Sequence, residues 1–87
     1  MIPAGGQDPG AYRKARVRAW LLGDERWAHD HPATGVVEVS QPGYRPPGVE
    51  VRAALTDTLL TAAVRPSALA ALDRDPLVVS VELTGWQ

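Results

Sequence analysis

Two histidines frame the one stretch of this sequence whose residue types suggest metal chemistry, His29-Asp30-His31. In an extended chain the side chains of His29 and His31 point to the same side, and the Asp30 carboxylate could supply an oxygen ligand. A structural zinc site needs four ligands and a catalytic site needs three from the protein, but the sequence holds no third histidine and no cysteine. We therefore expect no metal here and interpret the stretch as a loop that exposes two imidazoles.

Basic and aromatic side chains alternate with apolar ones in AYRKARVRAWLL, residues 11–22. This period of two predicts a strand, with a helix as the alternative. One face of the strand would carry Tyr12, Lys14, Arg16, Arg18 and Trp20. Strands that interleave basic groups with aromatic rings hold phosphates and stack bases, so this face is the candidate for binding nucleic acid. The competing interpretation is a solvated face whose charges prevent edge pairing.

The sequence offers little for catalysis. It contains no cysteine, and both histidines lie in one loop. Ser40, Ser67 and Ser80 have no base nearby in the sequence, and neither GxGxxG nor a P-loop occurs. We therefore expect a binding protein rather than an enzyme, and we expect no cofactor.

Composition limits the class of protein. With 87 residues, the chain suits one compact domain and not two. Hydrophobic residues make up 45% and charged residues 22%, as in globular proteins. The net charge of -1 shows that the chain as a whole is not a polycation built to bind nucleic acid. No apolar run is long enough to span a membrane, and MIPAGGQDPG lacks the features of a secretory signal. We expect a flexible leader at residues 1–10, one soluble domain at residues 11–87, a cytoplasmic location and no membrane partner.

The elements that must position these residues are short. After the strand at residues 11–22, we expect a polar segment at residues 23–35 with a helical turn over Asp24–His29. VVEVS, residues 36–40, predicts a strand, and the proline- and glycine-rich QPGYRPPG, residues 41–48, predicts a loop.

The second half of the sequence predicts a hairpin, a helix and a final strand. The hairpin joins residues 48–56, with Val49, Val51, Ala53 and Leu55 on one face, to residues 59–65 through a turn at Asp57-Thr58. Pro66 begins a helix over residues 66–74, which presents Leu69 and Leu72. In the last strand, residues 77–83, Leu77, Val79, Val81 and Leu83 share a face. Strands followed by one covering helix predict an α+β fold with an antiparallel sheet.

Three consecutive motifs cover residues 47–83: GVEVRAALTDTLLTAAV, RPSALAALDRDP and LVVSVEL. Together they resemble the central hairpin, the second helix and the final strand of the propeptide and inhibitor domain of subtilisin-type serine proteases. In that family a Leu-x-x-Leu pair and an Asp-Pro stop mark the helix, and Val-x-x-Val-Glu marks the strand. The sequence departs from the family before this region, because residues 23–35 are too short and too polar for its first helix.

The resemblance implies a ferredoxin-like β-α-β-β-α-β fold in a variant whose first helix is reduced or missing. Members of the family fold their protease and then inhibit it, with the sheet packed on the enzyme and the carboxy-terminal tail in its cleft. On this basis Val79 and Val81 would be core residues, and Glu82 the acidic residue near the tail. The cleft-entering segment would be Leu83, Thr84, Gly85, Trp86 and Gln87.

We therefore expect a non-enzymatic protein-binding module that acts as inhibitor or folding assistant of a subtilisin-type protease. The alternatives are a small nucleic-acid-binding domain, and a structural or assembly subunit that pairs through a sheet edge. Trp86 either packs back onto the sheet or anchors a partner. The oligomeric state is left open by the sequence.

Overall fold

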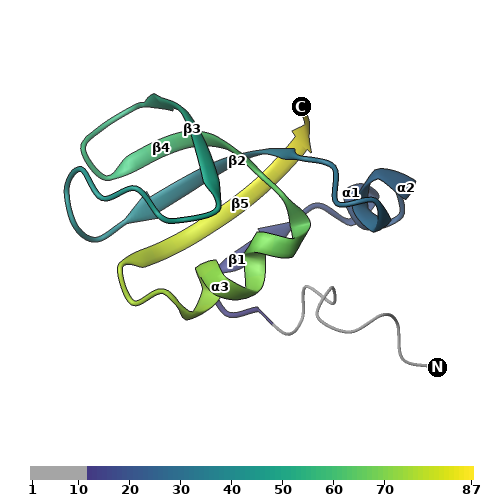
Figure 1. Cartoon of the computed structure of the whole chain (residues 1–87), viewed down its shortest axis with the longest axis horizontal. Helices are drawn as coiled ribbons and strands as arrows, with labels where there is room; N and C mark the ends of the chain where they lie inside the picture. Colours follow the sequence, from purple (N-terminus) through teal and green to yellow (C-terminus); the bar gives the residue numbers. More distant parts are fainter. Residues whose placement is uncertain (1–11) are drawn as a thin grey trace.

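A computed structural model describes residues 12–87, in which five strands form one sheet (Figure 1). The expected leader, residues 1–10, lies outside the described residues. The strands are β1 (Ala15–Val17), β2 (Ala33–Val39), β3 (Val49–Ala54), β4 (Leu59–Val64) and β5 (Val78–Trp86). The helices are α1 (Ala19–Leu22), α2 (Glu25–Ala28) and α3 (Leu69–Arg74), the last preceded by a 3-10 turn, Pro66–Ala68. The fold is therefore α+β, as expected.

The sheet is mixed rather than antiparallel throughout. Its strand order is β1-β5-β2-β4-β3, and β2, β3, β4 and β5 pair antiparallel, but β1 pairs parallel with β5. The expectation of a purely antiparallel sheet was wrong at this edge. The reason is that β1 and β2 lie on either side of β5, and the segment with α1 and α2 connects them across the end of β5 (Figure 1).

The predicted strand at residues 11–22 is only partly correct. β1 covers Ala15–Val17, whereas Ala19–Leu22 form the short helix α1. Ala and Leu favour a helix, and the turn buries Leu21 completely, so the helix alternative holds for this half. The expected turn near Asp24 is present as α2, whose first turn is capped by the Asp24 side chain.

One face of the sheet carries the core. The predicted helix at residues 66–74 is confirmed, and its Leu69 and Leu72 are 0% and 1% exposed. Leu21 of α1 and Trp27 of α2 join the same cluster, so three helices rather than one contribute to the core on this face. The core further includes Val37, Val39, Ala62, Val64, Val78, Val81 and Leu83 from the strands.

A β-bulge shifts the pattern of the last strand. Ser80 lies opposite Glu38 and Val78 lies opposite Val39, so Val79 is an extra residue between these pairs. Val79 is consequently 46% exposed, whereas Val78 is 1% exposed. The assignment of Val79 to the core was wrong, and that of Val81, at 1% exposure, is confirmed.

The predicted hairpin is confirmed as β3 and β4, but its first strand is less buried than expected. β3 is an edge strand, and its pairing with β4 shifts between Val51 and Ala53. Ala53 is exposed and Leu55, just beyond the strand, is 58% exposed. The apolar alternation in residues 48–56 therefore does not mark a fully buried face.

Candidate functional site

The sheet face opposite the core is the candidate site, and we call it the open face. All three helices pack against the core side, because Leu21, Trp27, Leu69 and Leu72 belong to one cluster with the inward residues of the strands. Within residues 12–87, no helix covers the other side. A sheet face left without a covering layer is a surface on which another macromolecule can pack.

Strand register arranges the open face in three rows. The first row is Ser80, Glu38 and Leu59. The second row is Arg16, Glu82, Val36, Thr61 and Ala53. The third row is Gly85, Thr34, Ala63 and Glu50.

A strap of polar side chains crosses the third row. Gln87 donates from Nε2 to Thr34 Oγ1 at 2.8 Å and accepts at Oε1 from Arg52 at 2.9 Å. Arg52 also pairs with Glu50 at 3.1 Å. Ala63, in this row, is only 6% exposed. The first two rows are thus the accessible part of the open face.

The accessible rows combine partly exposed apolar side chains with exposed carboxylates. Val36 and Leu59 are half-buried, and Glu38 and Glu82 are exposed. Leu55 adjoins Leu59 through a backbone hydrogen bond of 2.7 Å. The carboxylates alternate with the apolar side chains, because Glu38 stands opposite Leu59 and Glu82 stands opposite Val36. A surface that mixes apolar and polar groups in this way is typical of non-obligate protein interfaces. The sequence pattern does not single out Val36, Glu38 or Leu59, because alternation marks the two faces of a strand but not which face the helices cover.

The expected cleft-entering tail lies in the sheet instead. β5 continues to Trp86, and Leu83 is 0% exposed in the core. Thr84 and Gly85 belong to the same strand, and Trp86 packs against the core rather than projecting. Of the predicted partner-binding residues, Glu82 is exposed on the open face, and Gln87 forms the strap.

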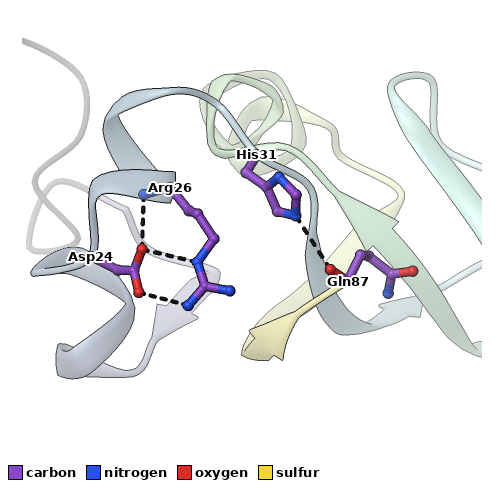
Figure 2. Close-up of polar contacts among 4 residues, drawn as sticks. All are labelled: Asp24, Arg26, His31 and Gln87. Carbon is purple, nitrogen blue, oxygen red and sulfur yellow. Dashed lines mark hydrogen bonds and ion pairs between the residues drawn. The ribbon is translucent and has the colours of Figure 1, made fainter.

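Trp86 is held between two side chains from the α2 region. The Arg26 guanidinium lies over its ring, 5.2 Å from the centroid, and the His31 ring meets it edge-on at 5.8 Å. Figure 2 shows the polar contacts around this packing, in which His31 Nε2 lies 3.2 Å from the Gln87 carbonyl oxygen. Of the two outcomes considered for Trp86, the structure shows packing onto the fold.

Asp24 fixes Arg26 in this arrangement. Its carboxylate accepts hydrogen bonds from Arg26 N at 2.8 Å, Nε at 3.0 Å and Nη2 at 2.8 Å (Figure 2). The side-chain and then the backbone hydrogen bonds from Arg26 lower the pKa of Asp24 to about 2. Asp24 therefore serves both as the cap of α2 and as the partner of the cation on Trp86.

The His29-Asp30-His31 stretch uses its carboxylate for structure. Asp30 has a φ of 58° and accepts hydrogen bonds from Ser67 N at 2.8 Å and Ser67 Oγ at 2.7 Å. Arg65 also donates to the Asp30 carbonyl oxygen at 2.9 Å. Among residues 12–87, no three His, Cys, Asp or Glu side chains gather as metal ligands would.

The five residues predicted to form one basic and aromatic strand face are separated in the fold. Tyr12 packs against the core, and Lys14 Nζ donates to the Asp75 carbonyl oxygen at 2.8 Å. Trp20 lies on α1 and not on the strand. Only Arg16 and Arg18 remain together, lining a hollow of about 120 Å³ with Val17 and Glu82. The prediction of a single five-residue face was therefore wrong, because the strand ends at Val17.

Comparison with known proteins supplies no relative. Within residues 12–87, none of the helices is long and apolar enough to cross a membrane. No family model matches the chain, and neither the curated proteins nor the solved structures contain a match.

Proposed function

We propose that this chain is a non-enzymatic protein-binding module that packs the first two rows of the open face on a subtilisin-type serine protease. It would act as an inhibitor or folding assistant of that enzyme. The observation that carries the proposal is the open face itself, where half-buried Val36 stands opposite exposed Glu82 and half-buried Leu59 stands opposite exposed Glu38.

The strand order supports the family likeness behind this proposal. Four strands in the order β5-β2-β4-β3, with α3 connecting β4 to β5, follow the ferredoxin-like order 4-1-3-2. Residues 40–48 connect β2 to β3 as a loop, at the place where the first helix of that fold would be. On this view β1 is an addition at the outer side of β5.

The mode of binding differs from that of the family in one respect. Because Leu83 is buried and Trp86 packs on the core, the segment that would enter the enzyme cleft is committed to the sheet. Affinity would come from burial of the open face, at roughly 25 cal/mol per Å² of apolar surface before the costs of association.

The test measures substrate hydrolysis and refolding of a panel of subtilisin-type proteases with and without the protein. Leu59→Arg and Glu38→Arg on the open face should each raise the inhibition constant at least about tenfold. Ala71→Arg introduces an arginine at an exposed position on α3 and should leave the inhibition constant unchanged. Urea denaturation establishes that each variant is folded.

Two results would reject the proposal. If micromolar protein neither inhibits nor assists the folding of any protease in the panel, the assigned partner is wrong. If Ala71→Arg weakens inhibition as much as Leu59→Arg does, the open face is not the binding surface.

A further inference from the structure

A second surface lies at the outer edge of β1, where Arg16, Arg18 and Trp20 follow one another along the chain. β1 is the last strand of the sheet and pairs only with β5 among the strands of residues 12–87. Ala15 is only 6% exposed, so the accessible part of this edge begins after it, and the outward N–H and C=O groups there have no neighbouring strand in the described chain. Such an edge accepts another strand in extended conformation.

The charges on this edge select the strand that can pair with it. Arg16 and Arg18 are exposed, and neither takes part in the ion pairs of residues 12–87. Together with Val17 and Glu82 they line the hollow of about 120 Å³, so its lining contains two arginines and one glutamate. A basic strand would be repelled, whereas an acidic one would add the missing counter-charges.

The spacing of Arg16 and Arg18 indicates which acidic peptide can pair with both side chains. Arg16 and Arg18 are two residues apart, and Arg18 keeps an extended backbone, with φ -64° and ψ 138°. Their side chains therefore leave the edge on the same side. A neighbouring strand presents residues i and i+2 on that side, so two carboxylates separated by one residue match the two guanidinium groups.

An exposed aromatic ring follows this edge in the sequence, at the start of α1. The ring is that of Trp20, which is 55% exposed. It is the largest of the exposed hydrophobic side chains in residues 12–87, which also include Leu55 and Val79. An aromatic side chain beside a charged edge can anchor the end of a bound peptide. Unlike Trp27 and Trp86, it is not part of the core cluster or its packed surroundings.

We propose that the β1 edge binds an acidic peptide segment with carboxylates at alternate positions, as an added strand. Arg16 and Arg18 pair with the carboxylates, and Trp20 contacts the end of the segment. Arg16 also belongs to the second row of the open face, so the two surfaces meet at this residue, but strand addition at the β1 edge needs no protease and does not depend on the proposed protease partner.

The experiment measures fluorescence anisotropy of a labelled peptide of about eight residues in which Glu and Val alternate, a length sufficient for one strand. Arg16→Ala and Arg18→Ala should each weaken binding about two- to fivefold, the value of one exposed ion pair, and added salt should weaken it further. Trp20→Ala should also weaken it. Arg45→Ala removes an exposed arginine in the loop before β3 and is the charge-matched control.

A second peptide tests the backbone pairing. Replacing its central valines by proline keeps every carboxylate but removes N–H donors and the ability to join a sheet. This peptide should not bind measurably, and only the alternating peptide should slow hydrogen exchange at the Val17 amide. Equal binding of the two peptides would overturn strand addition and leave only charge attraction.

Two further outcomes decide the proposal. Failure of the alternating peptide to bind at low salt rejects it. Tighter binding of single-stranded DNA than of the peptide would overturn it in favour of a nucleic-acid surface. Leu59→Arg should leave peptide binding intact, and Arg18→Ala should leave protease inhibition intact, so failure of one proposal is distinguishable from failure of the other.

Discussion

The guanidinium carbon of Arg26 lies 5.2 Å from the centroid of the Trp86 ring, which joins α2 to the end of β5. His31 meets the same ring from the side at 5.8 Å, and Gln87 accepts from the Arg52 side chain of β3. The last two residues of the sequence thus contact the α2 region, β2 and β3. The segment that the family likeness assigned to a partner stabilises this domain instead.

Removal of the Trp86 side chain is therefore expected to destabilise the fold. Trp86→Ala loses packing against the core and the cation–π contact with Arg26, and we expect a loss of about 2–4 kcal/mol in the free energy of unfolding. Urea denaturation measures it. Trp20→Ala is the control, because Trp20 is 55% exposed and its loss should cost less than about 0.5 kcal/mol. Equal effects of the two substitutions would contradict the packing of Trp86.

Gly35 lies at a point of β2 where the neighbouring strand leaves no room for a side chain. A Cβ atom at this position would lie 2.8 Å from Leu83 Cδ2 and 3.1 Å from the Glu82 carbonyl oxygen. Because Leu83 is 0% exposed and the second atom is backbone, neither can move freely. Gly35→Ala should therefore lower the free energy of unfolding by about 1–3 kcal/mol.

The matched control for that substitution is Gly23→Ala. No atom lies within 4 Å of a Cβ at Gly23, and the residue has a φ of -83° that alanine adopts readily. We expect little change, or a small gain from a less flexible unfolded chain. A Gly35→Ala protein as stable as the Gly23→Ala protein would show that β2 and β5 are not so close.

Local patterns in the sequence were sufficient to predict the hairpin, the helix at residues 66–74 and the presence of the last strand. Each has a strong local signal: Pro66 at the helix start, leucines three apart, or alternating valines. The bulge at Val79 left no such signal, because it depends on pairing with Glu38 and Val39 from a distant strand. A one-residue shift in register exchanges the buried and exposed faces of a strand. The prediction that Val79 is a core residue was therefore wrong, because Val79 is the extra residue of the bulge.

The site was harder to predict than the elements. The strand predicted for residues 11–22 ended early because Ala19–Leu22 form the helical turn α1, which buries Leu21 completely. Lys14 left the predicted face because Asp73 and Asp75 bind its backbone N–H and side chain. The open face depends on which side the helices cover, and that choice is made by tertiary packing rather than by any single segment.

Tyr44 links the loop between β2 and β3 to the end of α3. Its hydroxyl donates to the Asp75 carboxylate, and this hydrogen bond, followed by one from Leu77 N, lowers the pKa of Asp75. Tyr44→Phe should therefore raise the pKa of Asp75 toward its ordinary value of 3.8. Carbon-detected NMR of the carboxyl groups measures the change. Arg45→Ala, in the same loop, should leave it unchanged, and an unshifted Asp75 in Tyr44→Phe would exclude the contact.

Asp24 should make the free energy of unfolding depend on pH over a defined acidic range. Its pKa falls from 3.8 to about 2 because Arg26 donates to its carboxylate, so folding favours the charged form. A lowered pKa contributes stability above the unfolded value, and that stability is lost as the pH falls from 3.8 through 2. Asp24→Asn removes the charge but keeps a good helix cap.

The measurement compares urea denaturation of the natural protein and Asp24→Asn from neutral pH down to about 2, the range over which the linkage acts. Asp75 also has a lowered pKa, but it is present in both proteins and cancels in the difference. The natural protein should be more stable by a constant amount above the unfolded pKa, and the difference should close as the pH falls toward 2. A difference that is the same at every pH would mean that the Asp24 charge is not held by Arg26, and the cation over Trp86 would then lack its fixed partner.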